Sequence, residues 1–283
     1  MLECVVNVSE GRRRNVIGEL TTGCGAALLD VHTDPDHHRS VFTLAGPGER
    51  DAEDAARALT RAVAEQVDLS THNGVHPRLG AVDVVPFVAL EGSGADDAVA
   101  AARAYARWIA GELAVPAFLY GDADPQARAL PDLRRDAFTR RRPDAGPDAP
   151  HARLGAVAVG ARPPLVAVNC RLDRDDVGLA REIAAQVRER GGGLPGVRAL
   201  GLPLASQSRA QVSMNVTRLD ACGVERACTA VRRLAYEGGA DVGAVELVGL
   251  LPSAELERCS PEFREWSGIG PDQTIEARLR AHP

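Results

Sequence analysis

The chain has 283 residues, of which 45% are hydrophobic and 25% charged, and its formal net charge is −6. This balance is typical of a globular protein with one large domain or two modest ones, and its acidic sign argues against a general nucleic-acid-binding protein. All 33 basic residues are arginine, which excludes a P-loop that ends in Gly-Lys and a Schiff-base lysine.

The N-terminus leads directly into an apolar segment that is typical of a strand, so we expect no secretory leader. No run approaches the roughly 18 apolar residues that are needed to cross a bilayer. We therefore expect a cytoplasmic protein with no membrane association. The six cysteines are scattered without a Cys-x-x-Cys pair, which predicts buried reduced thiols and argues against a disulfide framework or a zinc site.

The first half of the chain alternates apolar runs with alanine-rich segments. The apolar runs predict strands at Leu2–Val8, Ala26–Val31, Ser40–Leu44, Ala81–Leu90 and Val115–Tyr120. Helical periodicity predicts helices at Asn15–Leu20, Glu49–Val67 and Asp96–Leu113, with aspartates near the start of the last two. The predicted order of this half is β-α-β-β-α-β-α-β.

Residues 140–150 contain three prolines and a glycine, which predicts a loop or linker. A short strand at Ala156–Val159 follows. The second half then predicts, in order, a strand at Leu165–Cys170, a helix at Asp175–Arg190, strands at Val197–Leu204 and Ala210–Leu219, a helix at Val224–Glu237 and a strand at Val245–Leu250. This β-α-β-β-α-β order is that of a ferredoxin-like unit. We predict an α/β (α+β) fold of two ferredoxin-like βαββαβ subdomains packed around a ligand groove.

The segment Thr71–Phe87 combines two histidines, an arginine and a glycine turn with an apolar strand that carries one carboxylate. A buried charge at Asp83 needs a partner, so we expect Asp83 to orient His76 or to pair with Arg78. A histidine with an ordinary pKa exchanges protons at cell pH, which makes His76 a candidate general acid or base. The alternative is a surface or packing histidine.

This segment has a near copy later in the chain. Residues 151–159 match residues 76–84 at seven of nine positions, but the second copy lacks the carboxylate and the proline. Such a match arises by chance or from an old duplication.

Three histidines and two aspartates lie within His32–His38, a composition that suggests a metal site. However, a proline interrupts the run, and no helical His pair or zinc spacing is present. A polar β-turn explains the same residues. We expect no metal, and a metal hydrolase built on His32, His37 and His38 remains an alternative.

Taken together, these motifs resemble the glutamate formimidoyltransferase (formiminotransferase) family. The resemblance covers almost the whole chain and rests on Leu2–Gly11, Leu28–Val31 with Arg39, His72–Phe87, Val115-Pro116 with Leu119–Gly121, Gly155-Ala156 with Gly160–Arg162, Ala210–Asn215 and Leu247–Leu250. The chain resembles the stand-alone form of the family, because no cyclodeaminase domain of the kind fused in animal enzymes is evident.

The resemblance implies a homodimeric enzyme with an N-terminal subdomain at 1–162, a C-terminal subdomain at 163–283 and a tetrahydrofolate groove between them. The implied reaction transfers the formimidoyl group from N-formimidoyl-L-glutamate to N5 of tetrahydrofolate, in histidine degradation. The products are 5-formimidoyltetrahydrofolate and L-glutamate. Tetrahydrofolate is then a co-substrate, no metal takes part, and a separate cyclodeaminase acts downstream.

The resemblance also implies functional residues. His76 matches the catalytic histidine of the family, and it would protonate the departing glutamate nitrogen. The folate-binding segment of the family matches Gly146, Pro147, Asp148, Ala149, Pro150, His151, Ala152, Arg153, Leu154 and Gly155. Supporting candidates are Asn7, Arg39, Arg78 and Asp83. Arg39, Arg78 and Arg153 would bind substrate carboxylates through paired hydrogen bonds.

Three positions depart from the family pattern, at His32, Val75 and Pro163-Pro164. They leave open a related folate-dependent transferase that uses N-formyl-glutamate as its donor. A non-catalytic folate-binding protein is the other alternative.

Overall fold

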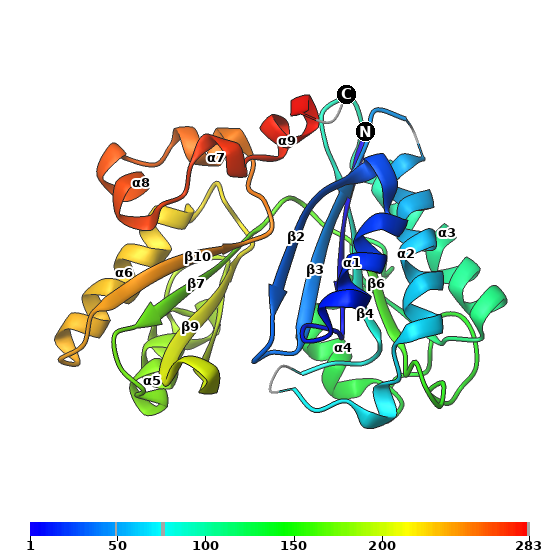
Figure 1. Ribbon diagram of the computed structural model, residues 1–283, viewed down its shortest axis with the longest axis horizontal. Helices are drawn as coiled ribbons and strands as arrows, with labels where there is room; N and C mark the ends of the chain where they lie inside the picture. The colour runs from blue at the N-terminus through cyan, green and yellow to red at the C-terminus, as the bar shows by residue number, and fades with distance from the viewer. Residues whose placement is uncertain (49, 75–76, 282–283) are drawn as a thin grey trace. The chain divides into compact units, whose positions relative to one another are not determined.

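The computed structural model describes residues 1–48, 50–74 and 77–281 (Figure 1). The described chain divides into two compact units, Met1–Pro163 and Pro164–Ala281. Each unit has its own sheet and its own hydrophobic core.

The first unit begins as a ferredoxin-like βαββαβ module. Its elements are β1 (Leu2–Val8), α1 (Arg14–Gly23), β2 (Leu28–Asp34), β3 (Arg39–Ala45), α2 (Asp51–Gln66) and β4 (Val82–Ala89). The four strands lie in the order β2-β3-β1-β4, and neighbouring strands are antiparallel. A short 3-10 helix, η1 (Gly25–Ala27), lies between α1 and β2, and another, η2 (Leu69–Thr71), lies between α2 and β4.

Two further strands enlarge this sheet beyond the predicted ferredoxin-like module. The chain continues through α3 (Ala95–Leu113), β5 (Ala117–Gly121), α4 (Leu130–Asp136) and β6 (Val157–Ala161). Strand β6 inserts between β4 and β5 and is parallel to both, which gives a six-stranded sheet. The strands that carry the two copies of the repeated motif therefore pair with each other, and the equivalent glycines of the copies, Gly80 and Gly155, form a bridge.

Helices cover one face of this sheet and part of the other. Helices α1, α2 and α3 pack on one face (Figure 1), and buried side chains such as Leu59, Phe87 and Tyr105 fill the space between. On the other face, α4 contributes Leu133 to a smaller cluster with Phe118 of β5 and Ala158 of β6. Helix α4 was not predicted, and it provides one residue of the site below.

The second unit is a four-stranded ferredoxin-like module, as predicted. It consists of β7 (Val166–Leu172), α5 (Val177–Val187), β8 (Val197–Leu204), β9 (Arg209–Val216), α6 (Val224–Glu237) and β10 (Val242–Val248). The strand order is β10-β7-β9-β8, and all neighbours are antiparallel. A short 3-10 helix, η3 (Glu189–Gly191), lies between α5 and β8, and another, η4 (Ala205–Gln207), lies between β8 and β9. Three short helices and a 3-10 turn that we did not predict complete the chain, at α7 (Ser253–Glu257), α8 (Pro261–Ser267), η5 (Pro271–Gln273) and α9 (Ile275–Ala281).

Most predicted boundaries differ from the observed ones by one to three residues, and two of the differences are instructive. The segment predicted as a strand at Ala26–Val31 starts as η1, and β2 extends to Asp34, because it pairs with β3 up to the turn. The helix predicted to reach Arg190 ends at Val187. All six cysteines are free and buried, which confirms the expectation for them. No helix in the described ranges is long and apolar enough to cross a membrane.

Candidate functional site

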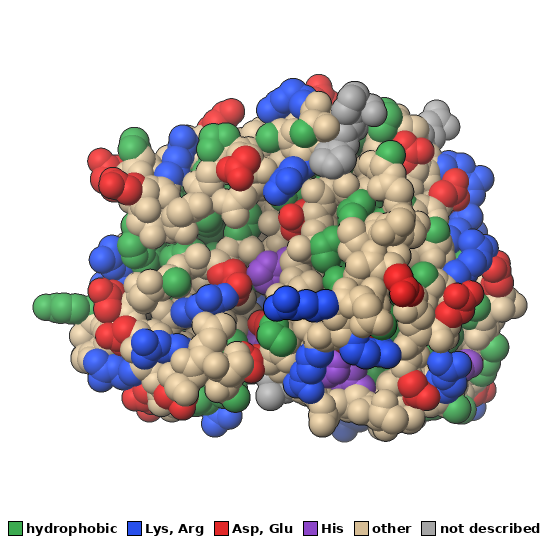
Figure 2. Space-filling view, in the orientation of Figure 1, with side chains coloured by type: hydrophobic (Ala, Val, Ile, Leu, Met, Phe, Trp, Pro, Cys, Tyr) green, Lys and Arg blue, Asp and Glu red, His purple; other side chains and the backbone are tan. Residues whose placement is uncertain are grey.

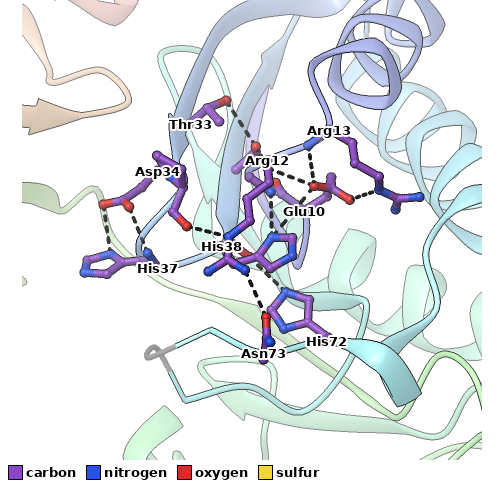
Figure 3. Close-up of polar contacts among 12 residues, drawn as sticks. Glu10, Arg12, Arg13, Thr33, Asp34, His37, His38, His72 and Asn73 are labelled. Atoms are coloured by element: carbon purple, nitrogen blue, oxygen red, sulfur yellow. Dashed lines mark hydrogen bonds and ion pairs between the residues drawn. The ribbon is translucent and has the colours of Figure 1, made fainter. Parts of the chain in front are cut away.

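Polar and charged side chains gather in the first unit where three segments meet. Glu10 follows the end of β1, His38 lies in the turn between β2 and β3, and His72 follows η2 (Figure 3). On the face shown in Figure 2, arginine side chains lie beside histidine side chains toward the bottom of the view. These three residues belong to the ferredoxin-like part of the unit and to the loop that enters β4, and α4 adds Arg134 beside them.

Glu10 is the buried carboxylate of this cluster, with 1% of its surface exposed. Its Oε1 accepts the backbone N–H groups of Arg12 and Arg13, both at 2.9 Å, and its Oε2 lies 2.6 Å from Arg13 Nε. Burial alone would raise the pKa of Glu10, but these donors and the Arg13 charge lower it below its ordinary value. Glu10 is therefore an ionised carboxylate at neutral pH.

His38 is held as a neutral imidazole. Its Nδ1 accepts the backbone N–H of Gly11 at 3.1 Å and lies 3.7 Å from Glu10 Oε1, so the ring proton is on Nε2. Burial, followed by the neighbouring His72, lowers the pKa of His38 to about 4, although Glu10 opposes the shift. The backbone of His38 is left-handed, with φ of 51°.

His72 stacks on His38 and is also neutral. The ring centroids are 4.0 Å apart, and His72 Nε2 lies 3.1 Å from the His38 carbonyl oxygen. Arg78 Nη1 lies 2.6 Å from His72 Nδ1 and 2.5 Å from Nε2. The His38 carbonyl can only accept, so Nε2 is the donor to it and Nδ1 is the ring nitrogen that can accept from the guanidinium. Nε2 therefore carries the proton and donates to the carbonyl. Burial and the charge of Arg78 lower the pKa of His72.

Arg12 ties the three segments together. Its Nε donates to the carbonyl of Pro35 in the β2–β3 turn, and its Nη1 donates to Asn73 Oδ1, both at 2.9 Å (Figure 3). Sequence reasoning did not single out Arg12, Glu10 or Asn73, because each is an ordinary loop residue until the fold brings the loops together.

The histidine-rich turn has its own internal contacts. Asp34 Oδ1 accepts the backbone N–H groups of Asp36 and His37, both at 2.8 Å, and Asp34 Oδ2 lies 3.2 Å from His37 Nδ1. These are the contacts of a polar β-turn. Within the described residues, no group of three or more His, Cys, Asp or Glu side chains is placed to hold a metal ion.

Asp83 pairs with an arginine that the sequence did not suggest. Its Oδ2 lies 2.6 Å from Nη2 of Arg134 on α4, and its Oδ1 accepts the backbone N–H of Leu79 at 2.6 Å. Arg134 also donates through Nη1 to the carbonyl of Pro77. Arg78 was one of the two expected partners of Asp83. Burial, the largest influence, lowers the pKa of Arg78, and the negative charge of Asp83 acts in the opposite direction.

The other expected residues lie at several places in the first unit. Arg39 begins β3, and burial lowers its pKa to about 10 while Asp83 opposes the shift. Asn7 Nδ2 donates to the carbonyl of Val5 on its own strand, at 3.2 Å. His76, the expected catalytic residue, and Val75 lie outside the described residues.

The segment 146–155 ends beside the entrance to β4. Ala81 donates its N–H to the carbonyl of Leu154 at 2.9 Å, so this end lies next to the loop that carries Arg78. His151 Nδ1 accepts the backbone N–H groups of Arg153 and Leu154, which closes a tight turn. The side chain of Arg153 is exposed and lies 3.5 Å from Asp68.

This ferredoxin-like unit gathers two neutral imidazoles, an ionised carboxylate and several arginines, and arginine and histidine are the side chains that proteins most often use to bind anions and to exchange protons. The comparison with known families is specific. Residues 1–162 match the N-terminal subdomain of the formiminotransferase domain, and residues 167–265 match the formiminotransferase domain. The chain belongs to the formiminotransferase family, which confirms the resemblance seen in its motifs.

Individual relatives agree with this assignment. A glutamate formimidoyltransferase of Streptococcus pyogenes is 36% identical over 271 residues, which cover 90% of each chain. One of Thermoplasma acidophilum is 32% identical and covers 99% of this chain and 97% of its own length. The formimidoyltransferase-cyclodeaminase of Sus scrofa is 36% identical, but the match spans 51% of that longer protein.

Proposed function

We propose that this protein is a glutamate formimidoyltransferase that moves the formimidoyl group of N-formimidoyl-L-glutamate to N5 of tetrahydrofolate. The observation that carries the proposal is the near full-length similarity to two proteins named for this activity. Tetrahydrofolate is then a co-substrate, and no metal takes part. The products are 5-formimidoyltetrahydrofolate and L-glutamate, which places the reaction in histidine degradation.

The reaction needs a group that exchanges protons. N5 attacks the amidine carbon and gives a tetrahedral intermediate, after which the bond from that carbon to the glutamate nitrogen breaks. N5 loses its proton, and the departing nitrogen gains one. We assign this exchange to His76, and general acid–base catalysis of this kind contributes about 100- to 10,000-fold in rate.

Binding of the two substrates is assigned to neighbouring residues. Residues 146–155 would hold the folate, and the contact between Leu154 and Ala81 supports this, because it joins that segment to the loop of Arg78. Arg78 and Arg39 are near enough to Asp83 that its charge acts to raise the pKa of both arginines, and the charge of Arg78 also acts on Arg39. They would bind substrate carboxylates.

The test is to incubate the purified protein with tetrahydrofolate and N-formimidoyl-L-glutamate. Formation of 5-formimidoyltetrahydrofolate is followed through its conversion in acid to the methenyl form. His76→Ala should abolish turnover and leave the affinity for tetrahydrofolate within a few-fold of wild type. Unchanged turnover would remove the proton-exchange role from His76.

The same experiment separates the alternatives. If tetrahydrofolate binds but N-formimidoyl-L-glutamate gives no product, then N-formyl-glutamate is the next donor to test. If neither donor reacts, a folate-binding protein without catalysis remains. A homodimer and a cytoplasmic location stay predictions, and the fused name of the animal relatives supports a separate cyclodeaminase downstream.

A further inference from the structure

One ion pair holds the loop that enters β4 at two backbone points. Asp83 accepts the N–H of Leu79 at 2.6 Å, and Arg134, paired with Asp83, donates to the carbonyl of Pro77. Pro77 and Leu79 are the two chain neighbours of Arg78. The pair therefore fixes the backbone on both sides of Arg78.

The ion pair between Asp83 and Arg134 is shielded from solvent, and α4, which carries Arg134, is packed against the sheet. The side chain of Asp83 is 2% exposed and that of Arg134 is 17% exposed. The residue before Arg134, Leu133, is buried against Phe118 of β5, which fastens α4 to the sheet. A guanidinium presents its donors in a planar fork, so one side chain serves a carboxylate and a carbonyl at once.

The consequence for the site runs through the side chain of Arg78. Its Nη1 contacts His72 at 2.6 Å, and its Nη2 donates to the carbonyl of His37 at 3.2 Å. Both contacts need the Arg78 backbone at one place, because a shift of the loop would move the guanidinium with it. His72 in turn stacks on His38.

We propose that Arg134 is a positioning residue of this site: together with Asp83 it fixes the backbone around Arg78 and so holds the Arg78 guanidinium against His72. Arg134 acts through Arg78 and is assigned no contact with substrate. The effect on turnover rests on the proposed function, whereas the effect on His72 does not.

The direct test is the titration of the His72 ring, followed by NMR. The charges of Arg78, Glu10 and Arg12 act on this ring, and the titratable ring of His38 stacks on it. Arg78→Ala removes the cationic neighbour of His72, so the pKa of His72 should be higher in this variant than in wild type. We expect Arg134→Lys to move the pKa of His72 at least half of the way to that value. Lysine keeps the charge but lacks the fork, so the shift reports geometry.

Arg135→Ala is the matched control. Arg135 is the next residue on α4, its side chain is 54% exposed, and it pairs with Asp132 of the same helix at 2.8 Å. This variant should leave the titration of His72 and the turnover unchanged. Asp83→Asn is a second probe, since its amide oxygen still accepts the Leu79 N–H while the ion pair is lost. It should shift His72 in the same direction as Arg134→Lys.

Kinetics then measure what the positioning contributes. Arg134→Ala should lower kcat about 100-fold, the cost of a misplacement of about 1 Å, with KM for tetrahydrofolate little changed. Millimolar guanidinium should restore part of the lost rate, because the free ion can bind between Asp83 and the Pro77 carbonyl. A merely structural role would give neither the KM-against-kcat split nor this rescue.

The outcomes are distinct. If the pKa of His72 in both Arg134→Lys and Asp83→Asn equals that of wild type, the proposal is overturned, whatever the kinetics show. A normal kcat in Arg134→Ala overturns it as well. If wild type itself is inactive, the proposed function fails, and the His72 titration alone decides whether Arg134 positions Arg78.

Discussion

The imidazole of His38 lies against that of His72, with the ring planes inclined by 28°. The stacked rings connect the β2–β3 turn to the loop after η2, and the hydrogen bond from His72 to the His38 carbonyl adds a second contact between these two loops. Two neutral rings pack in this way without the repulsion that two imidazolium ions would suffer. The contact between the two loops therefore depends on both histidines remaining uncharged.

The first prediction concerns pH and stability. The folded pKa of His38 is about 4, below the ordinary value of 6.5, so between these values the folded state binds fewer protons than the unfolded state. The free energy of unfolding should therefore rise with pH across this window, by at most about 3 kcal/mol from His38. Urea denaturation at a series of pH values measures it. In His38→Asn the rise should be smaller, and equal slopes would contradict the prediction.

The backbone at position 38 gives a second prediction. With φ of 51°, the site favours residues that tolerate the left-handed region, and asparagine is one of them. We expect His38→Ala to be about 1–2 kcal/mol less stable than His38→Asn at pH 8, where the imidazole charge has no influence. Asparagine also offers an oxygen to the Gly11 N–H. Chemical denaturation of both variants provides the comparison, and equal stabilities would show that the turn is unstrained.

Gly74 is the subject of a third prediction. An added Cβ would lie 2.5 Å from Arg78 Nη2 and 2.6 Å from the His37 carbonyl oxygen, closer than real side chains allow. Gly74→Ala should displace Arg78 from His72 and lower kcat about 10- to 100-fold. Gly18→Ala is the control, because nothing lies within 4 Å of its Cβ and α1 accepts alanine. A Gly74→Ala enzyme with normal turnover would mean that the Arg78 contact is dispensable.

A fourth prediction tests the segment that we assign to folate. Gly155 has φ of 68°, and an added Cβ would meet the carbonyl of Leu79 and, at 2.8 Å, the side chain of Leu69. Gly155→Ala should separate this segment from the entrance to β4 and weaken tetrahydrofolate binding about tenfold or more, about 1.4 kcal/mol. Gly192→Ala is the control. Gly192 also has a left-handed backbone, but open space surrounds it, so this variant should bind tetrahydrofolate with wild-type affinity. Titration calorimetry measures both.

The local pattern of the sequence predicted much of the fold. Helix α6 and strand β8 occupy the predicted residues, because a clear amphipathic helix and a bounded apolar run decide their structure locally. The insertion of β6 between β4 and β5 could not be predicted this way. Strand order depends on long-range pairing, and no local feature of β6 encodes its neighbours.

The same limit explains which site residues were missed. Asp83 attracted notice because a carboxylate within an apolar strand needs a partner. That partner, Arg134, lies 51 positions away on a seven-residue helix with little periodicity of its own. His38 lay in a run that suggested metal binding or a turn, and the sequence shows neither its left-handed backbone nor its stack on His72.

The left-handed turn at position 38 also limits how this site can change during evolution. Glycine, asparagine, aspartate and histidine adopt that backbone most readily, and a branched or bulky side chain would cost stability before its chemistry was tested. Of these four, only histidine provides a ring that stacks on His72. We expect the backbone to act as the first filter on mutations here, so that related chains exchange the residue within this small group while the turn itself persists.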